Sequence, residues 1–148
     1  MSRIRATGKR VERDGLHGLS CTKSAGRFSR HATLNSLIKQ TLGSLDLPSR
    51  LEPRGLYRTD GKRPDGITMI PWEMGKQLVW DVTVVDALAP SRLNLGSLCN
   101  PGTTATEAEA RKIEKYRELI DNGYIFQPVA MEVQGSLGES IEIFITRQ

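Results

Sequence analysis

Two acidic side chains, Asp65 and Asp81, lie on either side of a segment whose residue pattern predicts a β-hairpin. Residues 67–70 and 77–85 are rich in apolar and β-branched side chains, and the residues PWEMGK between them are typical of a turn. Partners in an antiparallel hairpin are equally distant from the centre of the turn. A turn centred on Glu73 therefore places Asp65 opposite Asp81, so that two carboxylates are predicted to meet at one position of a sheet.

Neighbouring carboxylates repel each other unless a cation lies between them. Mg²⁺ is a hard ion that proteins bind through one or two carboxylates together with water and substrate phosphate, so this pair predicts a magnesium site. The alternative is structural: Asp65 only forms the turn after Pro64, and Asp81 merely interrupts an edge strand. Asp81 is the more informative residue, because LVWDVTVV otherwise has the pattern of a buried strand, in which a carboxylate needs a partner.

A set of short motifs runs through the chain in a fixed order. GKRPDG at residues 61–66 and WDVTVVD at residues 80–86 form its centre. Around them stand HGLSC, GRFSRHATLN, LEPRGLYRTDGKRPDG, RKIEKY and YIFQP, and the whole set covers about residues 8–134. The set resembles the restriction-like endonuclease domain, a branch of the PD-(D/E)xK nucleases, at the C-terminus of site-specific non-LTR retrotransposon polyproteins, where it follows the reverse transcriptase.

The resemblance implies roles for four residues. Asp65 and Asp81 would bind a divalent metal ion, Mg²⁺ or Mn²⁺. The usual lysine two residues after the second acid is replaced by Thr83, a departure that resembles the transposon branch, in which the lysine has moved to the following helix. Lys112 and Lys115 are three residues apart and share one face of that helix, so they would orient the attacking water or stabilise charge in the transition state. Without the resemblance, both lysines are better explained as solvated partners of the neighbouring glutamates.

The implied reaction is hydrolysis of a phosphodiester bond in DNA by metal-assisted attack of water, with no covalent enzyme intermediate and no small-molecule cofactor. Glu52 is a candidate for a further acid near the metal. A DNA substrate implies a nuclear location, and the sequence leaves homodimerisation open. Two alternatives stand beside the enzyme: a catalytically inactive DNA-binding remnant of the same fold, and a small basic RNA-binding protein in which the acids are structural.

Charge is distributed unevenly along the chain. The 148 residues carry a net charge of +4, but residues 1–63 contain fourteen Lys or Arg against five acids, a net +9, and residues 64–148 sum to −5. A basic half is expected to bind polyanions, most simply the phosphates of nucleic acid, and the alternative is a solvated surface. The residues predicted to contact DNA are Arg27, Arg30, Lys62 and Arg63.

Residues 1–31 are predicted to form a basic arm with a degenerate zinc knuckle, and residues 32–148 the endonuclease domain. His17 and Cys21 have the H-x3-C spacing that ends such a knuckle, which precedes the nuclease in the elements that the chain resembles. Arg5 and Thr7 stand about where its two other cysteines are expected, and His31 is an unlikely substitute. Two ligands cannot complete a tetrahedral site, so zinc binding is predicted to be weak or absent.

The elements that must position these residues follow from hydrophobic periodicity and from the placement of Gly and Pro. No apolar run approaches the roughly 20 residues that span a bilayer, and Trp80 is predicted to belong to the core. The predicted elements are a helix at 33–43, a short strand within 49–59, the hairpin, a loop at 88–102, a helix at 105–120, and strands at 124–133 and 141–146. This order predicts an α/β or α+β fold, in which a small mixed sheet is flanked by helices.

Overall fold

A four-stranded mixed sheet with helices on both faces forms the centre of the protein, so the predicted fold class is confirmed at that level. The computed structural model describes residues 25–56, 59–88 and 100–146. The strands lie in the order β1-β2-β3-β4. In sequence the elements are α2 (Ala25–Ser44), β1 (Ser49–Leu51), β2 (Gly66–Thr68), β3 (Leu78–Val85), α3 (Thr103–Lys115), α4 (Arg117–Asp121), β4 (Ile125–Glu132) and α5 (Glu139–Thr146).

Strands β2 and β3 have the predicted register, although the tight turn between them is closed by Glu73 and Lys76 and is not centred on Glu73. Gly66 pairs with Trp80 and Ile67 with Val79, as predicted. Gly66 is needed at its position, because a Cβ atom there would collide with the indole ring of Trp80. Beyond Gly66, β2 ends while β3 continues, and the Asp65 N–H donates to the carbonyl oxygen of Trp80 at 3.0 Å, the same residue that Gly66 faces. The hairpin thus brings Asp65 alongside Asp81.

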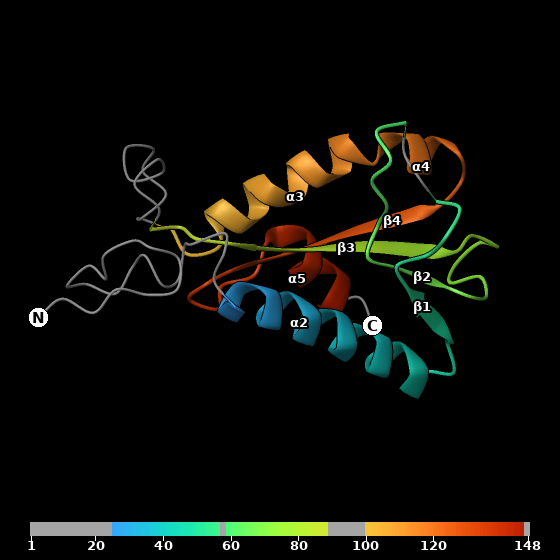
Figure 1. Ribbon diagram of the computed structural model, residues 1–148, viewed down its shortest axis with the longest axis horizontal. Helices are drawn as coiled ribbons and strands as arrows, with labels where there is room; N and C mark the ends of the chain where they lie inside the picture. Colours follow the sequence, from blue (N-terminus) through green and yellow to red (C-terminus); the bar gives the residue numbers. More distant parts are fainter. Residues whose placement is uncertain (1–24, 57–58, 89–99, 147–148) are drawn as a thin grey trace, which may run out of the picture.

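Strands β3 and β4 pair in parallel over their full length, from Leu78 opposite Ile125 to Val85 opposite Glu132. The connection between them crosses one face of the sheet through α3 and α4 (Figure 1). A parallel pair is normally covered on both faces, which explains why seven of the eight residues of β3 are buried, including the acidic Asp81.

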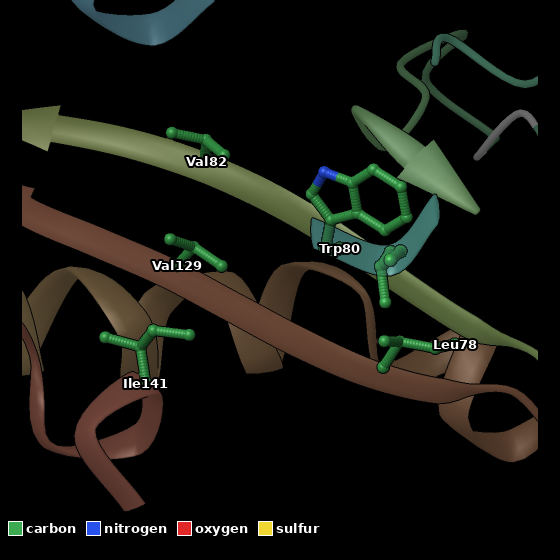
Figure 2. Packing of buried hydrophobic residues seen from close by; sticks show 6 residues of the cluster. Leu78, Trp80, Val82, Val129 and Ile141 are labelled. Atoms are coloured by element: carbon green, nitrogen blue, oxygen red, sulfur yellow. The ribbon is translucent and has the colours of Figure 1, made fainter. Parts of the chain in front are cut away.

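The two faces of the sheet are covered by different helices. Figure 1 shows α3 and α4 on one side of the sheet and α2 and α5 on the other. The core on the α2 and α5 side contains Trp80, which is buried as predicted (Figure 2). That cluster comprises Leu42, Leu78, Trp80, Val82, Val129 and Ile141. On the opposite face, Val79 packs with Tyr116, the residue at which the predicted helix 105–120 divides into α3 and α4.

Residues 141–146 form the helix α5, so the strand predicted there is wrong. Alternation of three isoleucines at positions 141, 143 and 145 suggested a strand, but only Ile141 is buried. The carboxylate of Glu109 accepts hydrogen bonds from the N–H groups of Ser140 (2.8 Å) and Ile141 (3.1 Å), which caps the helix from outside its own sequence. Ile141 and Phe144 then lie one turn apart and pack against the core.

Two further expectations need correction. Helix α2 begins at Ala25 rather than at residue 33, so residues 25–31 are helical and the boundary proposed after residue 31 falls inside this helix. Gly102 is the N-cap of α3, and no side chain caps it. The N–H of Thr104 instead donates to the buried carboxylate of Glu132 at 3.0 Å. No helix in the described part of the chain is long and apolar enough to cross a membrane.

Candidate active site

Asp65 lies at the open end of β2, and its carboxylate is fixed against the edge of β3. Its Oδ2 atom accepts a hydrogen bond from the Val82 N–H at 2.7 Å. This N–H belongs to the stretch of β3 that extends past β2, so the carboxylate takes the place of a strand partner. Because the Asp65 backbone also bonds to Trp80, both the main chain and the side chain hold it beside Asp81.

Asp81 faces the α3 and α4 side of the sheet and is 4% exposed. The Lys112 ammonium group, on α3, donates to Asp81 Oδ2. The Tyr116 hydroxyl lies 3.2 Å from Asp81 Oδ1 and 3.0 Å from the carbonyl oxygen of Arg63. The structure therefore brings Lys112 together with the acid pair across 31 residues of sequence.

Lys115 lies one turn from Lys112 and contacts an aromatic ring. Its Nζ atom lies 4.7 Å from the centroid of the Tyr116 ring, within the range of a cation–π interaction. Its charge also acts on Asp81, where it favours the ionised carboxylate. Lys112 contacts an acid of the pair directly, through its hydrogen bond to Asp81.

Helix α2 supplies two site residues that the sequence interpretation missed. His31 Nε2 lies 2.9 Å from Asp65 Oδ2, although His31 was considered only as a poor zinc ligand. Asn35, one turn later, accepts a hydrogen bond from Trp80 Nε1 at 3.0 Å and lies 3.4 Å from His31 Nδ1. The signal was present as H-x3-N spacing, which places both side chains on one face of a helix.

Tyr116 is the third missed residue. Its ring packs in the core, with its centroid 4.9 Å from that of Phe126. The hydroxyl, however, points to Asp81. The spacing K-x3-Y between Lys112 and Tyr116 indicates a shared helix face, and both side chains reach the same carboxylate.

The pKa values of the two acids are shifted in opposite directions. Burial raises the pKa of Asp81, and the neighbouring Asp65 raises it further, while Lys112 opposes both effects. Burial also disfavours the ionised form of Asp65, but hydrogen bonds from His31 and from the Val82 N–H outweigh it and lower the pKa of this carboxyl. The hydrogen bond to Asp65 raises the pKa of His31. The site therefore favours an ionised Asp65 paired with a protonated His31.

The donor atoms suit a hard divalent ion that completes its coordination from outside the protein. Within residues 25–56, 59–88 and 100–146, no group of three or more His, Cys, Asp or Glu side chains could hold a metal. Mg²⁺ is commonly bound by one or two carboxylates with water and phosphate, so Asp65 and Asp81 are the residues that would hold it. The hydroxyl of Thr83, two residues beyond Asp81 on β3, is buried with no hydrogen-bond partner in the described part of the chain, so a polar ligand beside Asp81 would satisfy it.

The structure describes some of the other candidate residues, and the rest lie outside the described part of the chain. Arg63 Nη2 binds Glu52 Oε2 at 2.5 Å, so the Glu52 carboxylate is engaged by an arginine. The backbone N–H of Lys62 donates a hydrogen bond to the Asp60 carboxylate, and Lys62 is exposed to solvent. Arg30 belongs to α2, as does the backbone of Arg27, whose side chain lies outside the described part. The proposed knuckle residues Arg5, Thr7, His17 and Cys21 also lie outside the described residues.

Comparisons with known proteins assign neither a family nor a function to this site. No model of a protein family matches the chain, and no curated protein matches it significantly. The function is therefore inferred from the site itself and from the motifs of the sequence.

Proposed function

We propose that this protein is a metal-dependent DNA endonuclease with the restriction-like core that its motifs resemble. The observation that carries the proposal is that Asp65, just before β2, is hydrogen-bonded to the residues on either side of Asp81, while Lys112 contacts Asp81 itself. A carboxylate in a buried strand costs free energy of folding unless the carboxylate has hydrogen-bonding or ionic partners. Two such carboxylates side by side, with a lysine from a crossover helix, are what metal-assisted hydrolysis of a phosphodiester requires.

Each residue of the site has a chemical task in this proposal. Asp65 and Asp81 would hold a divalent ion, which supplies Lewis-acid chemistry at the phosphate when bound. Lys112 donates hydrogen bonds and would stabilise negative charge on the phosphate oxygens as water attacks. Tyr116 orients the Asp81 carboxylate through its hydroxyl. Water forms one P–O bond while one ester P–O bond breaks; the attacking water loses a proton and the leaving oxygen gains one, so no covalent enzyme intermediate is needed.

The substrate is proposed to be DNA because basic residues lie next to the acid pair in the sequence. Lys62 and Arg63 lie three and two residues before Asp65, and Arg30 precedes His31 on α2. Phosphate contacts of this kind position a nucleic acid without reading its sequence. A DNA target is also the reason to propose a nuclear location.

Nicking of supercoiled plasmid DNA in Mg²⁺ or Mn²⁺ tests the proposal. Asp81→Asn keeps the size of the side chain and removes a metal-binding charge, so it should lower the nicking rate by about a hundredfold or more. Asp46→Asn is the matched control, because Asp46 is an exposed aspartate between α2 and β1 and should nick like the wild type. Equal rates for the wild type and Asp81→Asn would refute the enzyme.

A catalytically silent DNA-binding remnant is the second candidate, and one observation favours it. Both acids already have cationic partners in the protein: His31 for Asp65 and Lys112 for Asp81. Such pairs could stabilise the fold without any metal. DNA binding that is unchanged by Mg²⁺ and by Asp81→Asn, with no nicking, would favour this candidate, and preference for RNA at matched salt would favour an RNA-binding protein instead.

A further inference from the structure

A hollow rich in arginine lies beside the edge strand β1. Its volume is about 460 Å³, and it is lined by Arg50, Leu51, Glu52, Arg54 and Arg63. Arg50 and Leu51 belong to β1, where they pair with Ile67 and Gly66 of β2. The hollow is therefore built on the strand that neighbours the hairpin of the acid pair.

Positive charge is in excess in this hollow. Three guanidinium groups face one carboxylate, and that carboxylate binds Arg63. In the described part of the chain, neither Arg50 nor Arg54 forms an ion pair. Guanidinium groups bind phosphate through paired N–H donors, so an unneutralised arginine cluster is a suitable site for a phosphate group.

Two hydrogen bonds connect the hollow to the acid pair. The Glu52 N–H donates to the Asp65 carbonyl oxygen at 2.7 Å. The Tyr116 hydroxyl, which contacts Asp81, also lies 3.0 Å from the Arg63 carbonyl oxygen. One short segment, residues 63–65, thus contributes both a wall of the hollow and one of the two acids.

We propose that this hollow binds a backbone phosphate of the DNA strand whose neighbouring phosphodiester lies at Asp65 and Asp81. The inference rests on the proposed nuclease function and names a phosphate subsite of it. Arg50 and Arg54 are positioning residues that hold the strand by its charge. Glu52 competes with the phosphate for Arg63, and it gives up this ion pair when DNA binds.

The test compares two double variants that lose the same charge. Arg50→Ala/Arg54→Ala removes the unpaired guanidinium groups of the hollow, while Lys39→Ala/Lys76→Ala removes two exposed lysines outside it. Affinity for a short DNA duplex is measured without divalent ions at several salt concentrations, using the full chain. Each lost phosphate contact should reduce the slope of log K against log salt by about 0.9.

The arginine variant should bind about tenfold more weakly than the wild type, with a salt slope smaller by about one to two units, and the lysine variant should change little. Glu52→Gln should tighten binding several-fold, whereas a metal-ligand role for Glu52 would lower nicking and leave this affinity unchanged. Circular dichroism of each variant checks its folding.

The outcomes separate this inference from the nuclease itself. If the wild type nicks DNA but the arginine and lysine variants bind alike, the phosphate subsite is refuted and the enzyme stands. If nicking fails while only the arginine variant loses affinity and salt slope, the subsite is supported without the enzyme. If the wild type does not bind DNA, both proposals are refuted.

Discussion

Replacement of Lys112 by Met should destabilise the folded protein because it leaves a buried carboxylate without its cation. Asp81 is 4% exposed, and the charged groups that remain near it without Lys112 include a second carboxylate, Asp65. Breaking a fully buried ion pair by removing one partner costs about 3–5 kcal/mol. The Lys112 side chain is 22% exposed, and Asp81 can take up a proton, so about 2 kcal/mol is expected at neutral pH.

A double-mutant cycle isolates this interaction. Asp81→Asn removes both the buried charge and its repulsion with Asp65, so it should change the free energy of unfolding by less than about 1 kcal/mol. Lys112→Met combined with Asp81→Asn leaves no unpaired charge at this position and should be close in stability to Asp81→Asn alone. The coupling between the two sites should then be about 2 kcal/mol, the full effect of Lys112→Met in the wild type, measured by urea unfolding.

The loss of stability caused by Lys112→Met should depend on pH. Burial raises the pKa of Asp81, so the folded state favours the protonated form, and the cost of ionisation grows as pH rises above the ordinary pKa of an aspartic acid. Without Lys112 this cost increases, and the deficit of Lys112→Met should be greatest at neutral pH and shrink as the solution is acidified. Equal stability of Lys112→Met and the wild type at neutral pH would refute the contact as described.

Two further predictions concern the elements around the acid pair. The hydrogen bond to Asp65 raises the pKa of His31. The pair therefore stabilises the fold below the ordinary pKa of histidine, and this stabilisation is lost as the pH rises through the raised pKa. In urea unfolding, His31→Gln should cost about 1 kcal/mol near pH 5.5 and little near pH 8.5. A deficit that grows with pH would contradict this assignment. Gly66→Ala should lower stability by about 1–3 kcal/mol because its Cβ meets the Trp80 ring, whereas Gly43→Ala, where a Cβ meets open space in a helix, should be neutral or stabilising by thermal unfolding. Equal effects of the two substitutions would contradict the close packing at Gly66.

The hairpin could be predicted from the sequence because its information is local. The alternation of strand residues predicted the partners of Gly66 and Ile67 correctly, although the tight turn is centred between Met74 and Gly75 and not on Glu73. The same register predicted that Asp65 lies beside Asp81. Local pattern was sufficient wherever the elements were close in sequence and their turn had a definite centre.

The helix α5 could not be predicted because its cause is distant in sequence. Alternating isoleucines favour a strand locally, but a buried glutamate on α3, Glu109, accepts the first N–H groups of this segment. Gly138 makes room for that carboxylate, because a Cβ there would collide with it. Burial raises the pKa of Glu109, against the effect of these hydrogen bonds, which is the electrostatic cost of capping a helix from inside the core. Nothing in residues 139–146 by themselves indicates such a partner.

His31 was missed for a related reason. Residues 25–31 lack apolar periodicity, and their basic composition resembles an arm, so His31 was separated from the elements it contacts. Its role depends on the packing of α2 against β3, through the hydrogen bond between Asn35 and Trp80. Without that anchor, the sequence gives no reason to bring position 31 to the end of β2.

The contacts of the two acids differ in a way that bears on how a cation would enter the site. Asp81 is nearly closed off by Lys112 and Tyr116, and its side chain is 6% exposed. The Asp65 side chain is 20% exposed, and its partner His31 is 40% exposed, so this pair is the one in contact with solvent. A more exposed ion pair is weaker and more easily exchanged. In the proposed nuclease, a divalent ion would therefore reach the site from the Asp65 side by exchange with His31, while Lys112 remains on Asp81. The cation would replace His31, an ion-pair partner whose release costs the fold little free energy. A site whose carboxylates are neutralised by residues of the protein would in this way also hold a metal ion.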